Sequence, residues 1–271
     1  MNVYAIFAVV ALITATLGIG LYGLRFSRGT SDFFLASRSI SPFMNASAIS
    51  GEYLCAASFL GIAGAVMLYG IDMLWYPVGF TVGFLVMLIF ISAPLRRSGA
   101  YTLPDFAESR MGSRTVRRIA SAFVVVIGWL TLLPQMVASG LTLHAITGAP
   151  EAAGAIVLVL VVGLTVAAGG MRSITLVQAF QYWLKLIAIA LPGLVIAAVW
   201  VSHGGPTTTL HDWGEPLSGF GGRLHPFYTN LSIVVATFLG TMGLPHVLVR
   251  FYALPDGRTA RRTSLFVLTL L

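Results

Sequence analysis

The segment SPFMNASAISGEYLCAASFLG, from Ser41 to Gly61, decides the fold of this chain. It is long enough to cross a bilayer, yet it is rich in small and hydroxyl residues and holds one acid, Glu52, near its middle. A charged side chain at the centre of a membrane helix costs about 3 kcal/mol on insertion scales, so a helix that served only as an anchor would not keep one. Gly and Ser let a helix unwind and expose carbonyl groups, which is tolerated at membrane depth only where they line a cavity. We interpret the segment as a binding-site helix; the alternative is a helix that packs closely through its small residues.

The composition extends this interpretation to the whole chain. Hydrophobic residues make up 57% of the 271 residues and charged residues 9%, and the mean hydropathy is +0.90. Soluble domains carry roughly 25% charged residues, so the composition predicts a polytopic membrane protein. The single cysteine, Cys55, excludes an intrachain disulfide. The first apolar run lacks a basic leader and a cleavage site, which favours a retained helix over a signal peptide.

Apolar runs of about 20 residues predict the membrane helices. We expect them near 2–23, 41–69, 73–94, 117–146, 153–170, 174–201 and 228–252. An eighth run begins near 260 and is too short to cross a membrane by Leu271. We therefore expect a single transmembrane domain that forms the N-terminal part of a longer protein.

The charged residues alternate between the loops. Most of the basic residues fall in the first, third, fifth and seventh loops, as Arg25, Arg28, Arg38, Arg96, Arg97, Arg110, Arg114, Arg117, Arg118, Arg172, Arg250, Arg258, Arg261 and Arg262. The intervening loops hold Asp72, Glu151, Asp212 and Glu215, with Arg223 as their one basic residue. By the positive-inside rule the N-terminus lies outside and the odd-numbered loops are cytoplasmic. The net charge of +7 thus reflects membrane orientation, and we expect a lipid bilayer and no nucleic acid as partner.

Three motifs, in the same order along the chain, resemble the sodium:solute symporter family. They are DFFLASR at 32–38, YTLPDF at 101–106 with Arg110, and Gly169-Gly170-Met171 followed by Thr175, Val177 and Gln178. Ser37 is a mild departure from the small residue of the family pattern. AASFLG at 56–61 and GTMGLPHVLVRF at 240–251 are similar to the acetate/monocarboxylate branch of that family.

The resemblance implies an all-α fold of two inverted five-helix repeats, preceded by an extra N-terminal helix. The extra helix would cover 2–23, the first repeat 41–201, an outer loop 202–226 and the start of the second repeat 228–271. The first helix of each repeat is expected to be broken at mid-membrane. The residues agree, because Glu52 lies in a Gly/Ser-rich segment and the other helix contains Gly240, Gly243 and Pro245.

The resemblance also implies a sodium site with two backbone carbonyl ligands, at Gly51 and Leu54. An alignment on the acid itself would move both ligands one residue earlier, and the remaining family ligands would lie beyond Leu271. Glu52 balances the charge of the cation or lies in its entry path; the alternative is that it pairs structurally with a basic group such as Lys185, the only lysine in the chain.

The substrate would lie between the two broken helices. Tyr53, Ser58, Thr241 and His246 can offer hydrogen bonds to it, and a break near Gly243 could aim amide groups at a carboxylate. His246 is either a proton carrier or carboxylate partner, since its pKa can cross neutrality, or a structural residue near Arg250.

The sequence therefore predicts a secondary active symporter in the plasma membrane, with a bacterial source expected. It would couple a sodium or proton gradient to uptake of a small monocarboxylate such as acetate by alternating access. No organic cofactor and no enzyme activity are expected, because neither a nucleophile–base pair nor His/Cys metal spacing stands out. The alternatives are a transporter-like sensor domain of a signalling protein, and a family member that carries another solute such as proline.

Overall fold

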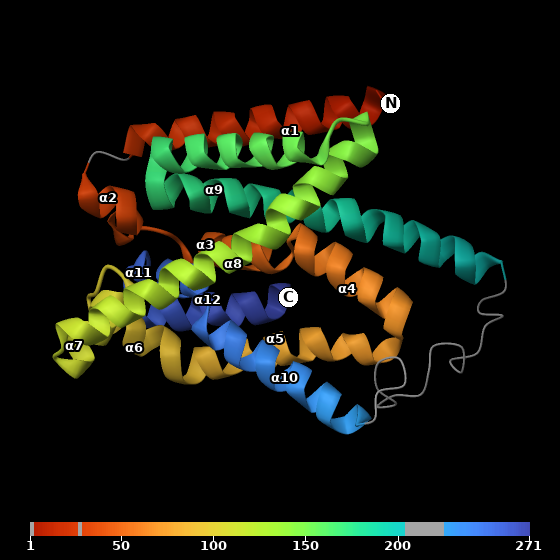
Figure 1. Cartoon of the computed structure of the whole chain (residues 1–271). Helices are drawn as coiled ribbons and strands as arrows, with labels where there is room; N and C mark the ends of the chain where they lie inside the picture. The colour runs from red at the N-terminus through yellow and green to blue at the C-terminus, as the bar shows by residue number, and fades with distance from the viewer. Residues whose placement is uncertain (1–2, 27–28, 204–224) are drawn as a thin grey trace.

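The computed structural model describes residues 3–26, 29–203 and 225–271, and over these residues the chain is helical and contains no strand (Figure 1). The helices are α1 (Val3–Tyr22), α2 (Thr30–Leu35), α3 (Pro42–Tyr53), α4 (Ala56–Tyr69), α5 (Trp75–Val86), α6 (Ser92–Arg97), α7 (Leu103–Met111), α8 (Arg114–Thr147), α9 (Glu151–Ser202), α10 (Pro226–Gly243), α11 (Pro245–Tyr252) and α12 (Gly257–Leu270). A π-helical turn, Met87–Ile91, joins α5 to α6. Arg28 and most of the expected outer loop, including Asp212, Glu215 and Arg223, lie outside the described residues.

Five helical segments among the described residues are long and apolar enough to cross a membrane. They are Val3–Tyr22, Ile71–Arg97, Arg114–Thr147, Gly169–Ser202 and Pro226–Tyr252. The bent pair α3 and α4 becomes a sixth if both halves form one span, and Glu151–Ala167 is a shorter apolar helix. The predicted all-α polytopic membrane fold is confirmed. The division into two repeats stays a prediction.

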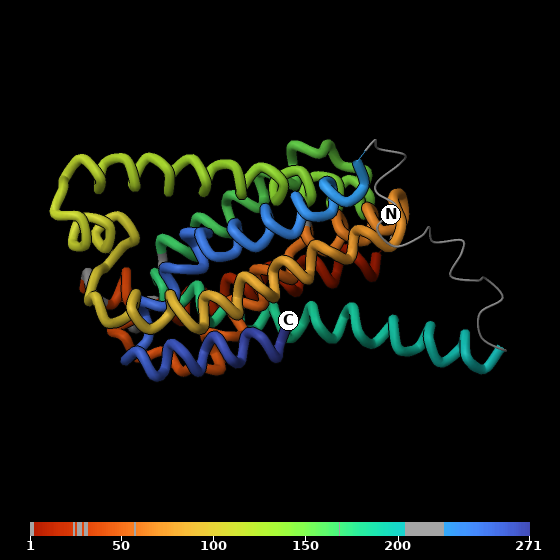
Figure 2. The backbone as a smooth tube through the Cα atoms, turned by 90° about the horizontal axis from the view of Figure 1, so that it is seen from below, coloured from red at the N-terminus to blue at the C-terminus, as the bar shows by residue number. Residues whose placement is uncertain are grey.

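Helix α9 folds back on itself at one glycine. Gly170 has φ 57° and ψ −151°, so the chain reverses there and the two arms of α9 run side by side (Figure 1). A Cβ at Gly170 would lie 2.5 Å from the Phe33 carbonyl oxygen, so this turn requires a residue without a side chain. The first arm lies along α1, and the far end of the second arm extends beyond the other helices (Figure 2). Every residue from 190 to 203 is exposed there.

The other helices gather around α3. Residues 45–51 of α3 are all buried, and α3 contacts the second arm of α9 on one side and α12 on another. The main cluster of buried apolar side chains joins α3 to α5, α11 and α12, and includes Ile49, Phe84, Phe251 and Val267. Helix α10 lies along α5. The polar, small-residue helix that the sequence singled out is therefore at the centre of the molecule.

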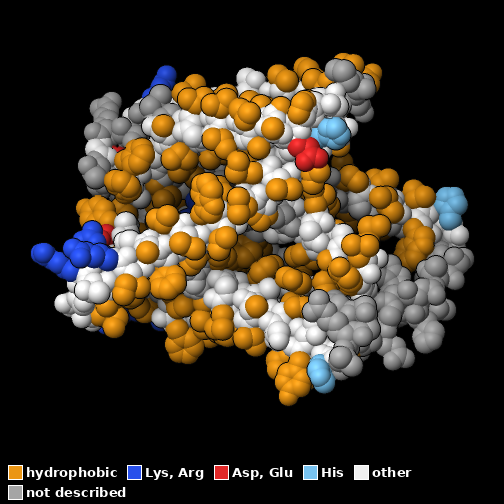
Figure 3. All heavy atoms as spheres, viewed as in Figure 1, with side chains coloured by type: hydrophobic (Ala, Val, Ile, Leu, Met, Phe, Trp, Pro, Cys, Tyr) orange, Lys and Arg blue, Asp and Glu red, His pale blue; other side chains and the backbone are white. Residues whose placement is uncertain are grey.

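Charge separates along the molecule. Hydrophobic side chains cover the face seen in Figure 3, and the blue side chains of basic residues gather toward the end that holds α7. At that end the capping box of Thr102 and Asp105 begins α7, and Arg117 of α8 pairs with Asp105 and Glu108 at 3.0 Å each. The predicted orientation of the chain in the membrane stays a prediction.

Candidate functional site

The first predicted break is confirmed, and it falls two residues after Glu52. Helix α3 ends at Tyr53, Leu54 has φ −80° and ψ 53°, and Cys55 is extended with φ −96° and ψ 168°. Helix α4 then starts at Ala56, and the two halves are bent by 44°. The Cys55 thiol caps α4, because its sulfur accepts a hydrogen bond from the Ser58 amide at 3.4 Å. Carbonyl groups of the last turn of α3 are thus released from regular helical pairing.

The second predicted break is confirmed at Leu244. Helix α10 ends at Gly243, Leu244 has φ −65° and ψ 113°, and α11 begins at Pro245. A residue that precedes proline is disfavoured in the helical region, which explains why the break falls there. Amide groups at the start of α11 therefore face the break.

A buried ion pair joins the two broken helices. The guanidinium of Arg250 in α11 donates to one carboxylate oxygen of Glu52 in α3, from Nη2 at 2.6 Å and from Nε at 2.8 Å. Only 3% of the Arg250 side chain and 13% of the Glu52 side chain are exposed. Arg250 also donates to the Thr175 hydroxyl of α9 at 3.3 Å, and its carbonyl accepts from the Asn45 amide at 3.2 Å.

The alternative that Glu52 pairs with a basic group agrees with the structure, but the suggested partner, Lys185, is wrong. Arg250 occupies the carboxylate of Glu52, and the Lys185 ammonium of α9 instead donates to the Gly51 carbonyl oxygen at 2.6 Å. The expectation that Arg250 is a loop residue is also wrong, because it is buried inside α11. An ionisable residue near the end of an apolar span was the signal that could have identified it.

The two carbonyl positions expected for a cation lie on either side of the end of α3. Gly51 is buried against α9, where an added Cβ would lie 3.0 Å from the Gln178 carbonyl oxygen and 3.1 Å from the Tyr182 Cβ. Leu54 donates its amide to the Ser50 carbonyl at 2.9 Å. Close approach of α3 and α9 is what brings Lys185 to Gly51.

The structure brings four of the expected substrate-binding residues to the region between the breaks. The Tyr53 ring packs against Phe80 and Phe84 of α5, with centroids 5.5 and 5.0 Å away, and its hydroxyl lies near Thr241. Thr241 is buried and donates to the Thr237 carbonyl at 2.8 Å. His246, the second residue of α11, lies near Glu52 and Arg250, and Gly243 ends α10.

Ser58 is placed differently from these residues. Its hydroxyl lies 3.2 Å from the Cys55 sulfur, which also accepts from the Gln135 amide of α8 at 3.2 Å. Ser58 therefore faces the α8 side of the first break. Gln135 was not expected at the site, and an amide inside an apolar helix was the signal for it.

Several polar atoms around α3 are buried and have no hydrogen-bond partner among the described residues. They are one oxygen of Glu52, the Tyr53 hydroxyl, the hydroxyls of Ser47 and Ser50, and the side-chain oxygens of Asn45 and Gln178. Buried polar groups in folded proteins are nearly always hydrogen-bonded. These atoms give the region the capacity to bind a polar solute.

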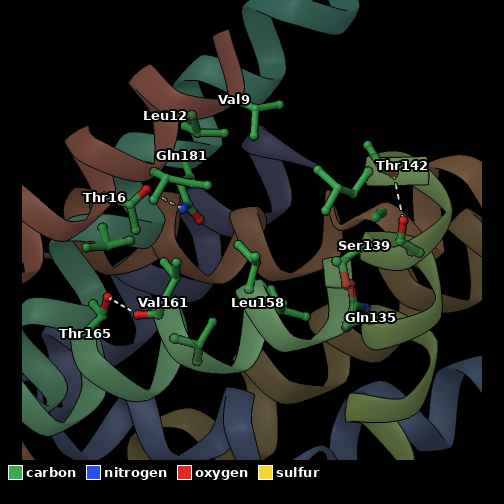
Figure 4. Close-up of a pocket in the computed structure, with 18 of the residues that line it drawn as sticks. Val9, Leu12, Thr16, Gln135, Ser139, Thr142, Leu158, Val161, Thr165 and Gln181 are labelled. Carbon is green, nitrogen blue, oxygen red and sulfur yellow. Dashed lines mark hydrogen bonds between the residues drawn. The ribbon is translucent and has the colours of Figure 1, made fainter. Parts of the chain in front are cut away.

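A separate cavity of about 420 Å³ lies between α1, α8 and the arms of α9 (Figure 4). Its walls are mostly aliphatic, and Thr16 of α1 and Gln181 of α9 lie next to each other in its lining, joined by a hydrogen bond of 3.1 Å. Ala56 beside the first break lines it, but none of the residues expected to bind cation or substrate does. Apolar walls suit a carboxylate poorly, so the cavity is not the expected substrate site.

Comparison with known proteins identifies relatives over nearly the whole chain. The chain is 32% identical over 269 residues to the Uncharacterized symporter YwcA of Bacillus subtilis. The matched region covers 96% of this chain and 52% of that protein. It is also 32% identical over 295 aligned positions to the Monocarboxylic acid transporter of Corynebacterium glutamicum. That match covers 100% of this chain and 52% of the relative. The chain thus spans about half the length of these curated relatives.

One family match covers both broken helices. The Sodium:solute symporter family matches residues 33–271, a range that begins after α1 and includes both breaks. This chain belongs to the sodium:solute symporter family.

Proposed function

We propose that the protein is a secondary active symporter that takes up a small monocarboxylate together with a cation across a bacterial plasma membrane. The observation that carries the proposal is the pair of broken helices, α3–α4 and α10–α11, tied together by Glu52 and Arg250. Interrupted helices at the start of two repeats are the best structural pointer to a transport site. Membership of a symporter family supports coupled transport.

A small carboxylate suits the region between the breaks. The start of α11 carries the positive end of a helix dipole, and His246, Tyr53 and Thr241 supply hydrogen-bonding groups there. The name of the Corynebacterium relative, a monocarboxylic acid transporter, supports the same substrate class. Acetate is the simplest member of that class.

Alternating access requires the broken helices to move against the rest of the bundle. The Glu52–Arg250 pair would make α3 and α11 move together, and the Arg250–Thr175 hydrogen bond would be a contact with α9 that changes during the movement. The cation is sodium, to which family membership points, or a proton, and Gly51, Leu54 and Glu52 mark the region where either would bind.

Uptake of radiolabelled acetate into proteoliposomes tests the proposal. The complete protein, expressed from its native reading frame, is reconstituted, and protein-free liposomes measure passive entry of acetic acid. We expect uptake above that background, with competition by unlabelled short monocarboxylates and none by proline. Uptake of proline without acetate would contradict the substrate class, and binding of acetate without uptake would favour a sensor.

A further inference from the structure

Lys185 is the one lysine of the chain, and it lies at the middle of a membrane helix. It stands halfway along the apolar segment Gly169–Ser202 and is only partly exposed. An ammonium group at this depth is costly, and ionisable residues inside membrane spans usually serve the transport pathway. Its Nζ atom donates to the Gly51 carbonyl oxygen at 2.6 Å.

The Gly51 carbonyl is one of the two oxygens that the family resemblance assigns to the cation. It lies in the last turn of α3, where the helix dipole places partial negative charge. An ammonium group and a sodium ion compete for the same carbonyl oxygen, because both are compact monovalent cations that bind oxygen. The side chain of Lys185 is therefore a cation already attached to the protein at this position.

The neighbouring charges strengthen the argument. Glu52 is neutralised by its buried pair with Arg250, so Glu52, Arg250 and Lys185 together carry a net charge of +1. A sodium ion added at Gly51 would meet this positive charge, and Glu52 has no second charge to balance it.

We propose that the Lys185 ammonium takes the place of a sodium ion at the Gly51 carbonyl, so that the protein does not bind sodium there. Lys185 is then the residue that determines which cation the transporter uses. The inference rests on the proposed function for the assignment of Gly51 to the cation pathway. A purely structural role, in which Lys185 only ties α9 to α3, predicts a loss of stability on substitution and no change in sodium binding.

Equilibrium binding of radioactive sodium to the purified complete protein tests the inference without requiring transport. The variants are wild type, Lys185→Ala, and Gln181→Ala as the matched control. Gln181 lies one turn earlier on the same helix and donates to Thr16 of α1, away from α3. We expect no saturable sodium binding in wild type or Gln181→Ala, and binding at least about tenfold tighter in Lys185→Ala.

Saturable sodium binding by the wild type would overturn the inference, and so would its absence from Lys185→Ala. If Lys185→Ala does not elute as a single folded species, Lys185→Gln replaces it, with the same expected gain. Failure of acetate uptake by the wild type would contradict the proposed substrate and leave the sodium-binding result to be judged by itself.

Discussion

At the residue scale, the ion pair between Glu52 and Arg250 differs from the pairs at the surface. Both of its side chains are largely shielded from water, whereas 53% of the Arg117 side chain is exposed. Removal of one partner from a buried pair leaves an uncompensated charge and typically costs about 3–5 kcal/mol, but an exposed pair is worth less than about 1 kcal/mol. Position inside the bundle, not the pairing itself, makes Arg250 important.

We therefore predict that Arg250→Ala lowers the apparent melting temperature of the detergent-purified protein far more than Arg117→Ala does. The double variant Glu52→Gln, Arg250→Met should recover part of the loss, because it removes both charges together. Thermal unfolding followed by circular dichroism measures the effect. Equal losses for Arg250→Ala and Arg117→Ala would contradict a buried pair.

The residues that the sequence predicted least well are the ones whose partners come from distant segments. Glu52 was identified because an acid inside an apolar span is conspicuous, but its partner lies 198 positions away. Lys185 stands out for the same reason, but the sequence does not show that it meets the Gly51 carbonyl. Sequence shows that a charge is buried, but only the packing of α3 against α9 and α11 shows what it meets.

At the element scale, two glycines of α5 set the approach of α5 to α10. A Cβ at Gly83 would lie 2.6 Å from the Thr241 Cβ and 2.9 Å from the Phe238 carbonyl oxygen, and Gly79 is similarly close to Thr237. Added volume at a close-packed contact usually costs about 1–3 kcal/mol. The contact also fixes Thr241, one of the proposed substrate-binding residues.

We predict that Gly83→Ala lowers both the melting temperature and the rate of acetate uptake. Gly64→Ala in α4 is the matched control, because nothing lies within 4 Å of a Cβ there. The control should leave stability unchanged or raise it slightly, since alanine favours a helix over glycine by about 1 kcal/mol. If both variants behave alike, close packing at Gly83 is not what holds α5 against α10.

The two breaks differ in how far sequence could predict them. Proline at position 245 restricts the residue before it, so the break at Leu244 follows from local chemistry. The break at Leu54–Cys55 contains neither proline nor glycine, so the sequence indicated its region but not its position. There the cap from Cys55 and the tertiary contacts of α3 determine where the helix ends.

We predict that Pro245→Ala reduces acetate uptake while the protein still inserts and folds. The substitution removes the steric restriction on Leu244 and lets α10 continue into α11, so fewer amide groups face the break. Uptake and size-exclusion elution are measured together. Unchanged uptake in a folded Pro245→Ala protein would mean that packing alone maintains the break.

At the scale of the whole molecule, the distribution of charge predicts which side of the membrane each end faces. Helix α8 begins at the basic end and is long enough, at 34 residues, to reach the other side. In a Cys55→Ser background, we expect Thr115→Cys to be protected from a membrane-impermeant maleimide in intact cells and Ala152→Cys to react. Both positions are exposed in the first turns of α8 and α9. The opposite labelling pattern would reverse the predicted orientation.

The charge around Gly51 leads to a last prediction, on the energy source of transport. A sodium ion about 4 Å from a net charge of +1 would be repelled by roughly 4 kcal/mol at an effective dielectric constant of 20. We therefore expect that a sodium gradient does not raise acetate uptake by the complete protein, while an inward proton gradient in sodium-free medium does. Protein-free liposomes correct for passive entry of acetic acid, and Gln181→Ala controls for substitution on the same helix. Uptake that rises to saturation with external sodium and is unaffected by the proton gradient would contradict the proposal that Lys185 keeps sodium from the Gly51 carbonyl.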